Sequence, residues 1–280
     1  MTPFFAMPIF PPLARRVRFG ILFGCALGLP LLAAAVPADQ PAPRPGEKFR
    51  LAHEQLLAKA HAGRIDLYFL GDSITRRWGA TDYPAMLAHW QANFHGWNAG
   101  NFGWGGDSTE NILWRVEHGE LDGVNPRVIV LLAGTNNLGL HPPPGAVDEV
   151  PRGIKAIIDV CRRKAPHAVI ILTAIFPRND SEAANAAIRA INPKLAAFAD
   201  GRTIRFLNVN DRLADEQGRL FPGMTMDQLH PTVKGYEVWA EGLRPLLTEL
   251  LGPRGKEDCA PPPTGEPIVD ANGRAVSMTP

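Results

Sequence analysis

Short apolar runs alternate with segments of helical periodicity along most of the chain. Five runs have the length of buried strands and occupy residues 65–70, 96–103, 127–134, 168–176 and 204–209. The run "RVIVLLAG" is the clearest, because it is β-branched and carries no charge after Arg127. Between the runs, apolar residues recur every three or four positions. The last such segment has Tyr236, Trp239, Leu243, Leu246 and Leu250. This alternation predicts helices between the strands.

Strands that alternate with helices predict a three-layer α/β/α fold, in which a parallel sheet carries helices on both faces. In such sheets, ligands bind at the carboxyl ends of the strands. Polar signatures lie at those ends: "GDS" follows the first strand, "NFGWGGD" the second and "GTNN" the third. "MDQLHP" (226–231) comes after the fifth strand and leads into the last helix. The sequence therefore predicts a functional site at this edge of the sheet.

These signatures resemble the SGNH (GDSL) hydrolase family, most of all the catalytic subunits of platelet-activating-factor acetylhydrolase and their bacterial relatives. The matching blocks are "FLGDSIT" (69–75), "NFGWGGDSTENILWRVEHGEL" (101–121), "GTNN" (134–137) and "DQLHP" (227–231). The resemblance extends over about 65–250. It implies a flavodoxin-like sheet of five parallel strands and ester hydrolysis that needs no metal or organic cofactor.

Ser73 follows a strand directly, where a serine most often caps a helix. Ester cleavage by a serine requires a base within hydrogen-bond reach and donors aimed at the developing oxyanion. The resemblance assigns Ser73 as the nucleophile, His230 as the base and Asp227 as the acid that orients it, through the spacing D-x-x-H. Asp72 is expected to stabilise the turn rather than take part in chemistry. The signature G-x-S-x-G of α/β-hydrolases is absent from the sequence.

The chain has eight histidines, and their positions separate one of them from the rest. Five lie in or beside helix-like segments and are expected at the surface; they are His53, His61, His89, His118 and His167. His95 and His141 lie in predicted loops. Only His230 follows the fifth strand and has an aspartate three residues before it.

The oxyanion donors implied by the resemblance come from three blocks. They are the backbone N–H groups of Ser73 and Gly106 and the side-chain amide of Asn136. Asn137 is an adjacent competitor for the last of these roles. Candidate pocket residues are Ile74 and Leu229, which flank the catalytic residues, and Trp104, although a tryptophan in this position also suits packing.

Prolines concentrate at both ends of the chain and set the expected boundaries. We expect a signal peptide at 1–38, a linker at 39–47, the hydrolase domain at 48–252 and a flexible Pro-rich tail at 253–280.

The expected signal peptide has a basic region followed by an apolar run over residues 20–36 that ends in small residues. Cleavage after Ala35 or Ala38 would fit. The alternative is an uncleaved membrane anchor, for which a run interrupted by Pro30 is short, since a span needs about 20 residues.

Charge and cysteine content exclude some partners. Removal of residues 1–38, with their three arginines and no acidic residue, changes the formal charge from +1 to −2. No basic surface for nucleic acid is therefore expected. Cys161 and Cys259 would remain, either paired or free, and the Cys and His residues lack the spacing of a metal site.

The sequence thus predicts an exported serine esterase, periplasmic or secreted, that cleaves short acyl esters, acetyl esters first among them. The substrate would be a small-molecule or carbohydrate ester, and the enzyme a monomer or a homodimer. A lysophospholipase or thioesterase acting on longer chains is the nearest alternative. A non-catalytic module that binds carbohydrate is a third hypothesis, which intact Ser73, His230 and oxyanion blocks disfavour.

Overall fold

A sheet of five parallel strands forms the centre of the protein in the computed structural model, which describes Met1 and residues 36–270. Its order is β2-β1-β3-β4-β5. The strands are β1 (Leu67–Gly71), β2 (Ala99–Gly103), β3 (Val128–Leu132), β4 (Val169–Thr173) and β5 (Ile204–Leu207). Four of them lie within the apolar runs, and β1 extends one residue beyond its run, so the predicted fold class is confirmed.

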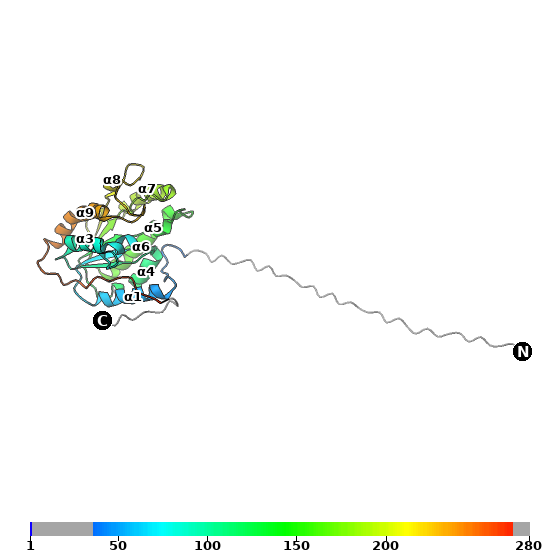
Figure 1. The fold of residues 1–280 in the computed structure, drawn as a ribbon, viewed down its shortest axis with the longest axis horizontal. Coiled ribbons are helices and arrows are strands. Elements are labelled where there is room, and N and C mark those ends of the chain that lie inside the picture. Colours follow the sequence, from blue (N-terminus) through cyan, green and yellow to red (C-terminus); the bar gives the residue numbers. More distant parts are fainter. Residues whose placement is uncertain (2–35, 271–280) are drawn as a thin grey trace. The chain divides into compact units, whose positions relative to one another are not determined.

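Helices fill the connections and cover both faces of the sheet (Figure 1). They are α1 (Glu47–Ala60), α2 (Ser73–Gly79), α3 (Pro84–Phe94), α4 (Thr109–Arg115), η1 (Val116–Glu120), α5 (Thr135–Leu138), α6 (Ala146–Lys164), α7 (Glu182–Ala196), α8 (Asn210–Leu213) and α9 (Val233–Leu251).

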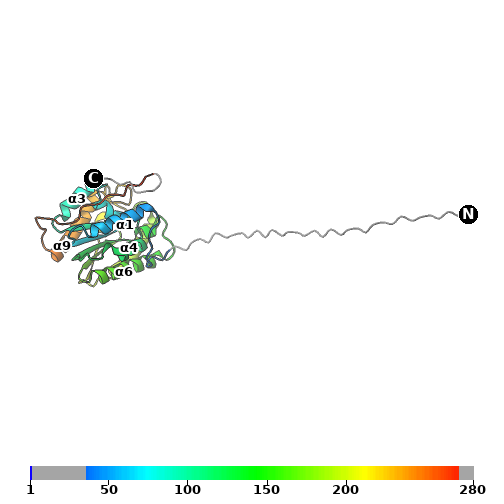
Figure 2. The same ribbon diagram turned by 90° about the horizontal axis from the view of Figure 1, so that it is seen from below.

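Alternate side chains of each strand enter two separate cores, as the period of two in a strand requires. Tyr68 and Leu70 of β1 pack with α1, α4, α6 and α7 on one face. Leu67 and Phe69 pack with α2, α3 and α9 on the other. Figure 2 shows α1, α4 and α6 beside one another in the first of these layers.

The described unit begins at Val36, twelve residues before the expected start of the domain. Its first residues, expected in part to be a free linker, lie against α4. The Ala42 N–H donates to Glu110 O at 3.1 Å, and Thr109 Oγ1 donates to Ala38 O at 2.9 Å. Ala38 is 5% exposed. The prolines prevent a helix here, but they leave carbonyl groups that the side chains of α4 can bind.

The expectation of a flexible tail is wrong for residues 253–270, which lie along the surface of the domain. The Gly255 N–H donates to Gly96 O at 2.8 Å, and the Arg64 N–H donates to Cys259 O at 3.0 Å. The Thr81 N–H donates to Thr264 O at 3.2 Å. Proline and glycine exclude regular structure in this segment, yet its carbonyls still pair with loops next to β1 and β2.

The expected signal peptide lies outside the described residues, apart from Met1 and residues 36–38. No helix within the described part of the chain combines the length and apolarity needed to cross a membrane. Cys161 is buried in the core and Cys259 is exposed, and both are free thiols.

Candidate active site

The first strand ends at a glycine because no other residue fits there. A Cβ atom on Gly71 would lie 2.2 Å from Thr75 Oγ1 and 2.4 Å from the carbonyl oxygen of Leu132. The backbone of β1 can therefore pass close to the end of β3 and then turn sharply into α2. This turn places Ser73 at the carboxyl edge of the sheet.

Ser73 is the first residue of α2, and Asp72 caps that helix. The Ile74 N–H donates to Asp72 Oδ1 at 2.8 Å. Burial raises the pKa of Asp72 to about 7. This capping bond is consistent with the expectation that Asp72 stabilises the turn. Because Asp72 caps the helix, Ser73 is not needed as the capping residue.

Two hydrogen bonds join Ser73, His230 and Asp227 in a line. His230 Nε2 lies 2.8 Å from Ser73 Oγ, and His230 Nδ1 lies 2.7 Å from Asp227 Oδ2. Because a carboxylate only accepts, Nδ1 carries the proton and donates it to Asp227. Nε2 is then the acceptor for the serine hydroxyl. The structure thus brings Ser73 to Asp227 and His230, which lie more than 150 positions further along the sequence.

A tight loop before α9 sets the orientation of His230. The His230 N–H donates to Asp227 Oδ1 at 2.8 Å, while Gln228 adopts a left-handed conformation with φ of 68°. The Asn179 N–H donates to Gln228 O at 2.7 Å and anchors the loop to the segment after β4. The D-x-x-H spacing is therefore a closed turn, in which one carboxylate binds both the backbone and the ring of the same histidine.

The electrostatic surroundings keep His230 neutral and Asp227 charged. Burial, assisted by the positive charge of Arg77, lowers the pKa of His230 below its usual value, and Asp227 only partly opposes this. Partial burial acts to raise the pKa of Asp227, but hydrogen bonds from the backbone and ring of His230 outweigh it and lower that pKa to about 2. A neutral imidazole beside a serine hydroxyl is the state in which a general base works.

The loop after β2 carries the glycine expected to donate to the oxyanion. Gly106 has a φ of 78°, a conformation that favours glycine. Its neighbour Asp107 accepts a hydrogen bond at its backbone oxygen from Asn136 Nδ2, at 2.8 Å. The blocks that hold Gly106 and Asn136 are therefore directly connected, and one amide hydrogen of Asn136 is still available.

Asn137, the competing candidate, has its side chain fully occupied elsewhere. Its Oδ1 accepts from the Thr109 N–H at 3.0 Å, and its Nδ2 donates to Thr109 Oγ1 at 3.1 Å and to Glu110 Oε2 at 3.0 Å. Asn137 thus fixes the start of α4. This difference favours Asn136 over Asn137 for a role toward substrate.

A buried arginine ties the strand ends to the loop of Gly106. Arg115 Nε donates to Asp107 Oδ2 at 2.7 Å, and Nη2 donates to the carbonyl oxygens of Gly71 at 3.3 Å and Phe102 at 3.2 Å. Nη1 donates to Glu120 Oε2. This role of Arg115 was not predictable from the sequence, because a single arginine in a helical segment is normally exposed.

Arg44 is the second residue whose position the sequence did not reveal. It lies in the segment expected to be a linker, yet its Nη1 donates to Gly105 O and forms an ion pair with Asp107 Oδ1 at 3.4 Å. Its guanidinium approaches Gly106 so closely that a Cβ there would lie 3.1 Å from Nη1. Arg44 thus supports the loop through Gly105 and Asp107 Oδ1, whereas Arg115 binds Asp107 Oδ2.

The three candidate pocket residues differ in exposure. Ile74 is 1% exposed and packs in one core cluster with residues of α9, so little of its surface is open to a ligand. Trp104 is 7% exposed, packs against Phe49 and lies 4.9 Å under the guanidinium of Arg76. Leu229 is only partly buried, and of the three it has the most surface to offer a ligand.

Of the histidines expected at the surface, His53 is buried and His89 is partly buried. His53 Nδ1 lies 2.8 Å from Glu120 Oε1, and His89 accepts a hydrogen bond from Trp78 Nε1 at 3.0 Å. Neither forms a hydrogen bond with Ser73. Within residues 36–270, no three His, Cys, Asp or Glu side chains are grouped in a way that could hold a metal ion.

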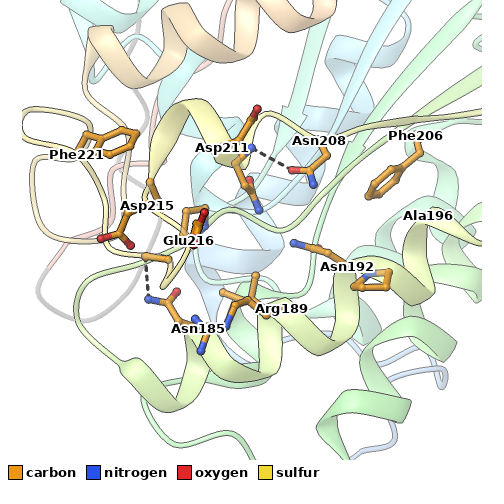
Figure 3. A pocket seen from close by; sticks show the side chains of 16 residues that line it. Asn185, Arg189, Asn192, Ala196, Phe206, Asn208, Asp211, Asp215, Glu216 and Phe221 are labelled. Atoms are coloured by element: carbon orange, nitrogen blue, oxygen red, sulfur yellow. Dashed lines mark hydrogen bonds between the residues drawn. The ribbon is translucent and has the colours of Figure 1, made fainter.

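A cavity of about 750 Å³ lies apart from these residues, between α7 and the segment after β5. Figure 3 shows Asn185, Arg189 and Asn192 of α7 on one side of it and Asp211 and Glu216 on the other. Neither Ser73 nor His230 lines it. The volume of this cavity is therefore not a measure of the space available to a ligand at Ser73.

Comparison with known proteins gives the family of this chain. The sequence pattern of the GDSL-like lipase/acylhydrolase family matches residues 69–238, which contain Ser73, Gly106, Asn136, Asp227 and His230. The chain belongs to this family, and it is a carboxylic ester hydrolase of the GDSL type.

Two similar curated proteins are platelet-activating factor acetylhydrolase IB subunits. The chain is 29% identical to platelet-activating factor acetylhydrolase IB subunit alpha1 of Bos taurus over 240 residues, which cover 82% of this chain and 97% of that protein. It is 28% identical to subunit alpha2 of Rattus norvegicus over 226 residues, 78% of this chain and 91% of that protein. Among solved structures, a GDSL-like lipase from Bacteroides thetaiotaomicron has the same fold, with a TM-score of 0.58 and 19% identity over 70% of this chain and 97% of that one.

Proposed function

We propose that the protein is a serine esterase in which Ser73 is the nucleophile, His230 the general base and Asp227 the residue that orients the base. The observation that carries this proposal is the pair of hydrogen bonds at 2.8 and 2.7 Å that joins the three side chains. Family membership supports the reaction class, and the geometry supports the assignment of roles.

The proposed reaction has two steps, acylation of Ser73 and hydrolysis of the acyl-enzyme. Ser73 Oγ attacks the ester carbonyl while its proton moves to His230 Nε2, and the tetrahedral intermediate then expels the alcohol, which takes that proton. The acyl-enzyme remains. Water next gives a proton to His230 and attacks the same carbonyl, and the acid leaves as Ser73 recovers the proton. Asp227 stays ionised throughout and stabilises the imidazolium.

The proposed oxyanion hole consists of the Ser73 N–H, the Gly106 N–H and the Asn136 amide. Support comes from the positive φ of Gly106 and from the bond between Asn136 and Asp107, which holds the two blocks together. Such donors stabilise a charge that develops only in the transition state.

We propose a short acyl group, acetyl first among them, as the preferred substrate. The support is the similarity to proteins named platelet-activating factor acetylhydrolase IB subunits. We also propose export, for which the support is the basic and apolar N-terminal segment. Because Ala38 is buried in the domain, cleavage after Ala35 is preferred to cleavage after Ala38.

The test uses p-nitrophenyl esters with two to twelve acyl carbons, with wild type beside Ser73→Ala. We expect activity on the shortest esters that falls by about 10⁵–10⁶-fold in the variant. Activity that rises with chain length would overturn the acetyl proposal in favour of a lysophospholipase or thioesterase. Activity that survives in Ser73→Ala would overturn the nucleophile. Absence of turnover on all esters would favour a binding module.

A further inference from the structure

Arg77 binds the same carboxylate oxygen as the ring of His230. Its Nη1 donates to Asp227 Oδ2 at 3.1 Å, and that oxygen also accepts from His230 Nδ1 at 2.7 Å. Ser73 and Arg77 are four residues apart on α2 and so lie on the same face of the helix. The helix α2 therefore contributes a residue to each end of the hydrogen-bonded series Ser73–His230–Asp227: Ser73 binds the ring of His230, and Arg77 binds the carboxylate of Asp227.

The guanidinium of Arg77 is held in place by further contacts. Its side chain is 22% exposed, and its Cζ lies 5.3 Å from the centre of the Tyr83 ring. Nη1 also lies 3.6 Å from Met226 Sδ, beside Asp227. The aromatic ring and the ion pair together restrict a side chain that would otherwise sample many rotamers.

Charged groups reach His230 from three elements. Its own loop supplies Asp227, α2 supplies Arg77, and the segment after β4 supplies Arg178, which is itself paired with Asp180 at 2.5 Å. The buried groups nearby are Asp72, at the start of α2, and Tyr236 of α9, whose hydroxyl donates to Ile74 O at 2.8 Å. Two cations thus face an imidazole that has a single carboxylate partner.

We propose that Arg77 is a positioning residue of this site: it orients Asp227 and shares that carboxylate's charge, so that His230 remains a neutral base in mildly acidic solution. The inference rests on the proposed Ser73–His230–Asp227 mechanism and adds the pH range in which that mechanism works.

The physical argument concerns what a shared carboxylate can do. A carboxylate bound to His230 alone favours the imidazolium, and would keep the ring protonated at low pH. A guanidinium on the same oxygen offsets much of that negative charge and repels a proton on the ring. Protonation of the base is then shifted to lower pH, and the hydrogen bond that orients the ring is kept. The pKa of His230 is lowered, in agreement with this argument. Burial is the largest cause, and the positive charge of Arg77 is the second.

The test separates charge from hydrogen bonding at position 77. Arg77→Gln keeps a donor but removes the charge, Arg77→Lys keeps the charge, and Arg77→Met removes both. We expect the apparent pKa in kcat/KM to rise by about 0.5 to 1 in Arg77→Gln and Arg77→Met, and to stay near wild type in Arg77→Lys. Well below both pKa values, kcat/KM of the Gln variant would then fall by about 3- to 10-fold relative to wild type.

Arg212→Gln is the matched control, because Arg212 of α8 forms an ion pair with Glu241 and does not contact His230. The same loss of charge there should leave the pH profile unchanged. If Arg77 only stabilised the fold, the Gln variant would lose activity equally at every pH, and the proposal would be overturned. A pKa that stays in place or moves down would also overturn it.

A direct titration of the His230 ring by NMR keeps this outcome separate from failure of the proposed function. The ring's pKa should rise in Arg77→Gln whether or not an ester is turned over. If the ring titration moves but activity persists in Ser73→Ala, then the mechanism fails and the role of Arg77 stands. If Ser73 is essential but the ring titration does not move, then the role of Arg77 fails alone.

Discussion

Asn136 donates a hydrogen bond to the backbone oxygen of Asp107, whereas its neighbour Asn137 uses its whole amide to hold the start of α4. Two adjacent and chemically identical side chains therefore have different structural roles. One connects two loops at the edge of the sheet and retains a free N–H, and the other fixes a helix. The difference provides an internal control for the first prediction.

Asn136→Ala should lower kcat by about 10²–10³-fold with little change in KM, because an oxyanion donor acts only in the transition state. Asn137→Ala should leave kcat within a few-fold of wild type and should lower the melting temperature instead, since it removes the acceptor of the Thr109 N–H and a donor to Glu110 at the start of α4. Steady-state kinetics and thermal unfolding of both variants check this. A larger loss of kcat in Asn137→Ala would exchange the two roles.

The pH dependence of the wild type should follow the protonation of His230. The active form carries the neutral ring, so kcat/KM falls as pH decreases through the pKa of His230. Burial and Arg77 lower that pKa, so the midpoint should lie below about 6.5, the usual value for histidine. A profile with its midpoint at or above pH 7 would contradict this.

Arg115→Met should destabilise the whole domain. Asp107 and Glu120 are fully buried and would be left without the cation that both contact. Removal of one partner from a buried ion pair typically costs about 3–5 kcal/mol. Urea unfolding measures the loss. Arg162→Met, an exposed position on α6, is the control and should change the free energy of unfolding by less than about 0.5 kcal/mol.

Arg44→Gln should reduce kcat several-fold while the melting temperature changes little. The side chain is 37% exposed and contributes one hydrogen bond to Gly105 and one ion pair to Asp107. Loss of such a bond corresponds to about 1 kcal/mol. This is roughly a fivefold change in rate if the loop that carries Gly106 then becomes less well positioned. Kinetics at a fixed pH test this. Unchanged kcat would show that Gly106 holds its position without Arg44.

Much of the fold and of the candidate site was predictable because its signals are local. Five apolar runs, each with β-branched or aromatic residues, specify the strands, and the spacing of Asp227 and His230 within one loop is visible in the sequence. Gly71 and Gly106 also stand where the backbone needs them, at a close approach and at a positive φ.

What escaped prediction depends on contacts between distant residues. Arg44 lies 61 residues before the carbonyl it binds, in a proline-rich stretch with the composition of a linker. The C-terminal segment has the same composition, and its pairing with Gly96 and Arg64 leaves no periodic trace. Arg115 and His53 resemble surface residues in sequence, because only the fold brings their carboxylate partners to them.

The packing of both terminal segments decides where the chain can be cut and joined. Lys48 of α1 forms an ion pair with Glu266, and the Glu266 N–H donates to Asp82 Oδ1 at 3.0 Å, so the last described residues fasten α1 to the loop before α3. A gene fragment trimmed to the family match would lose this fastening together with Arg44. A reporter or affinity tag is better placed beyond residue 270 than at the borders of that match, and a chimera should inherit residues 36–270 as one piece.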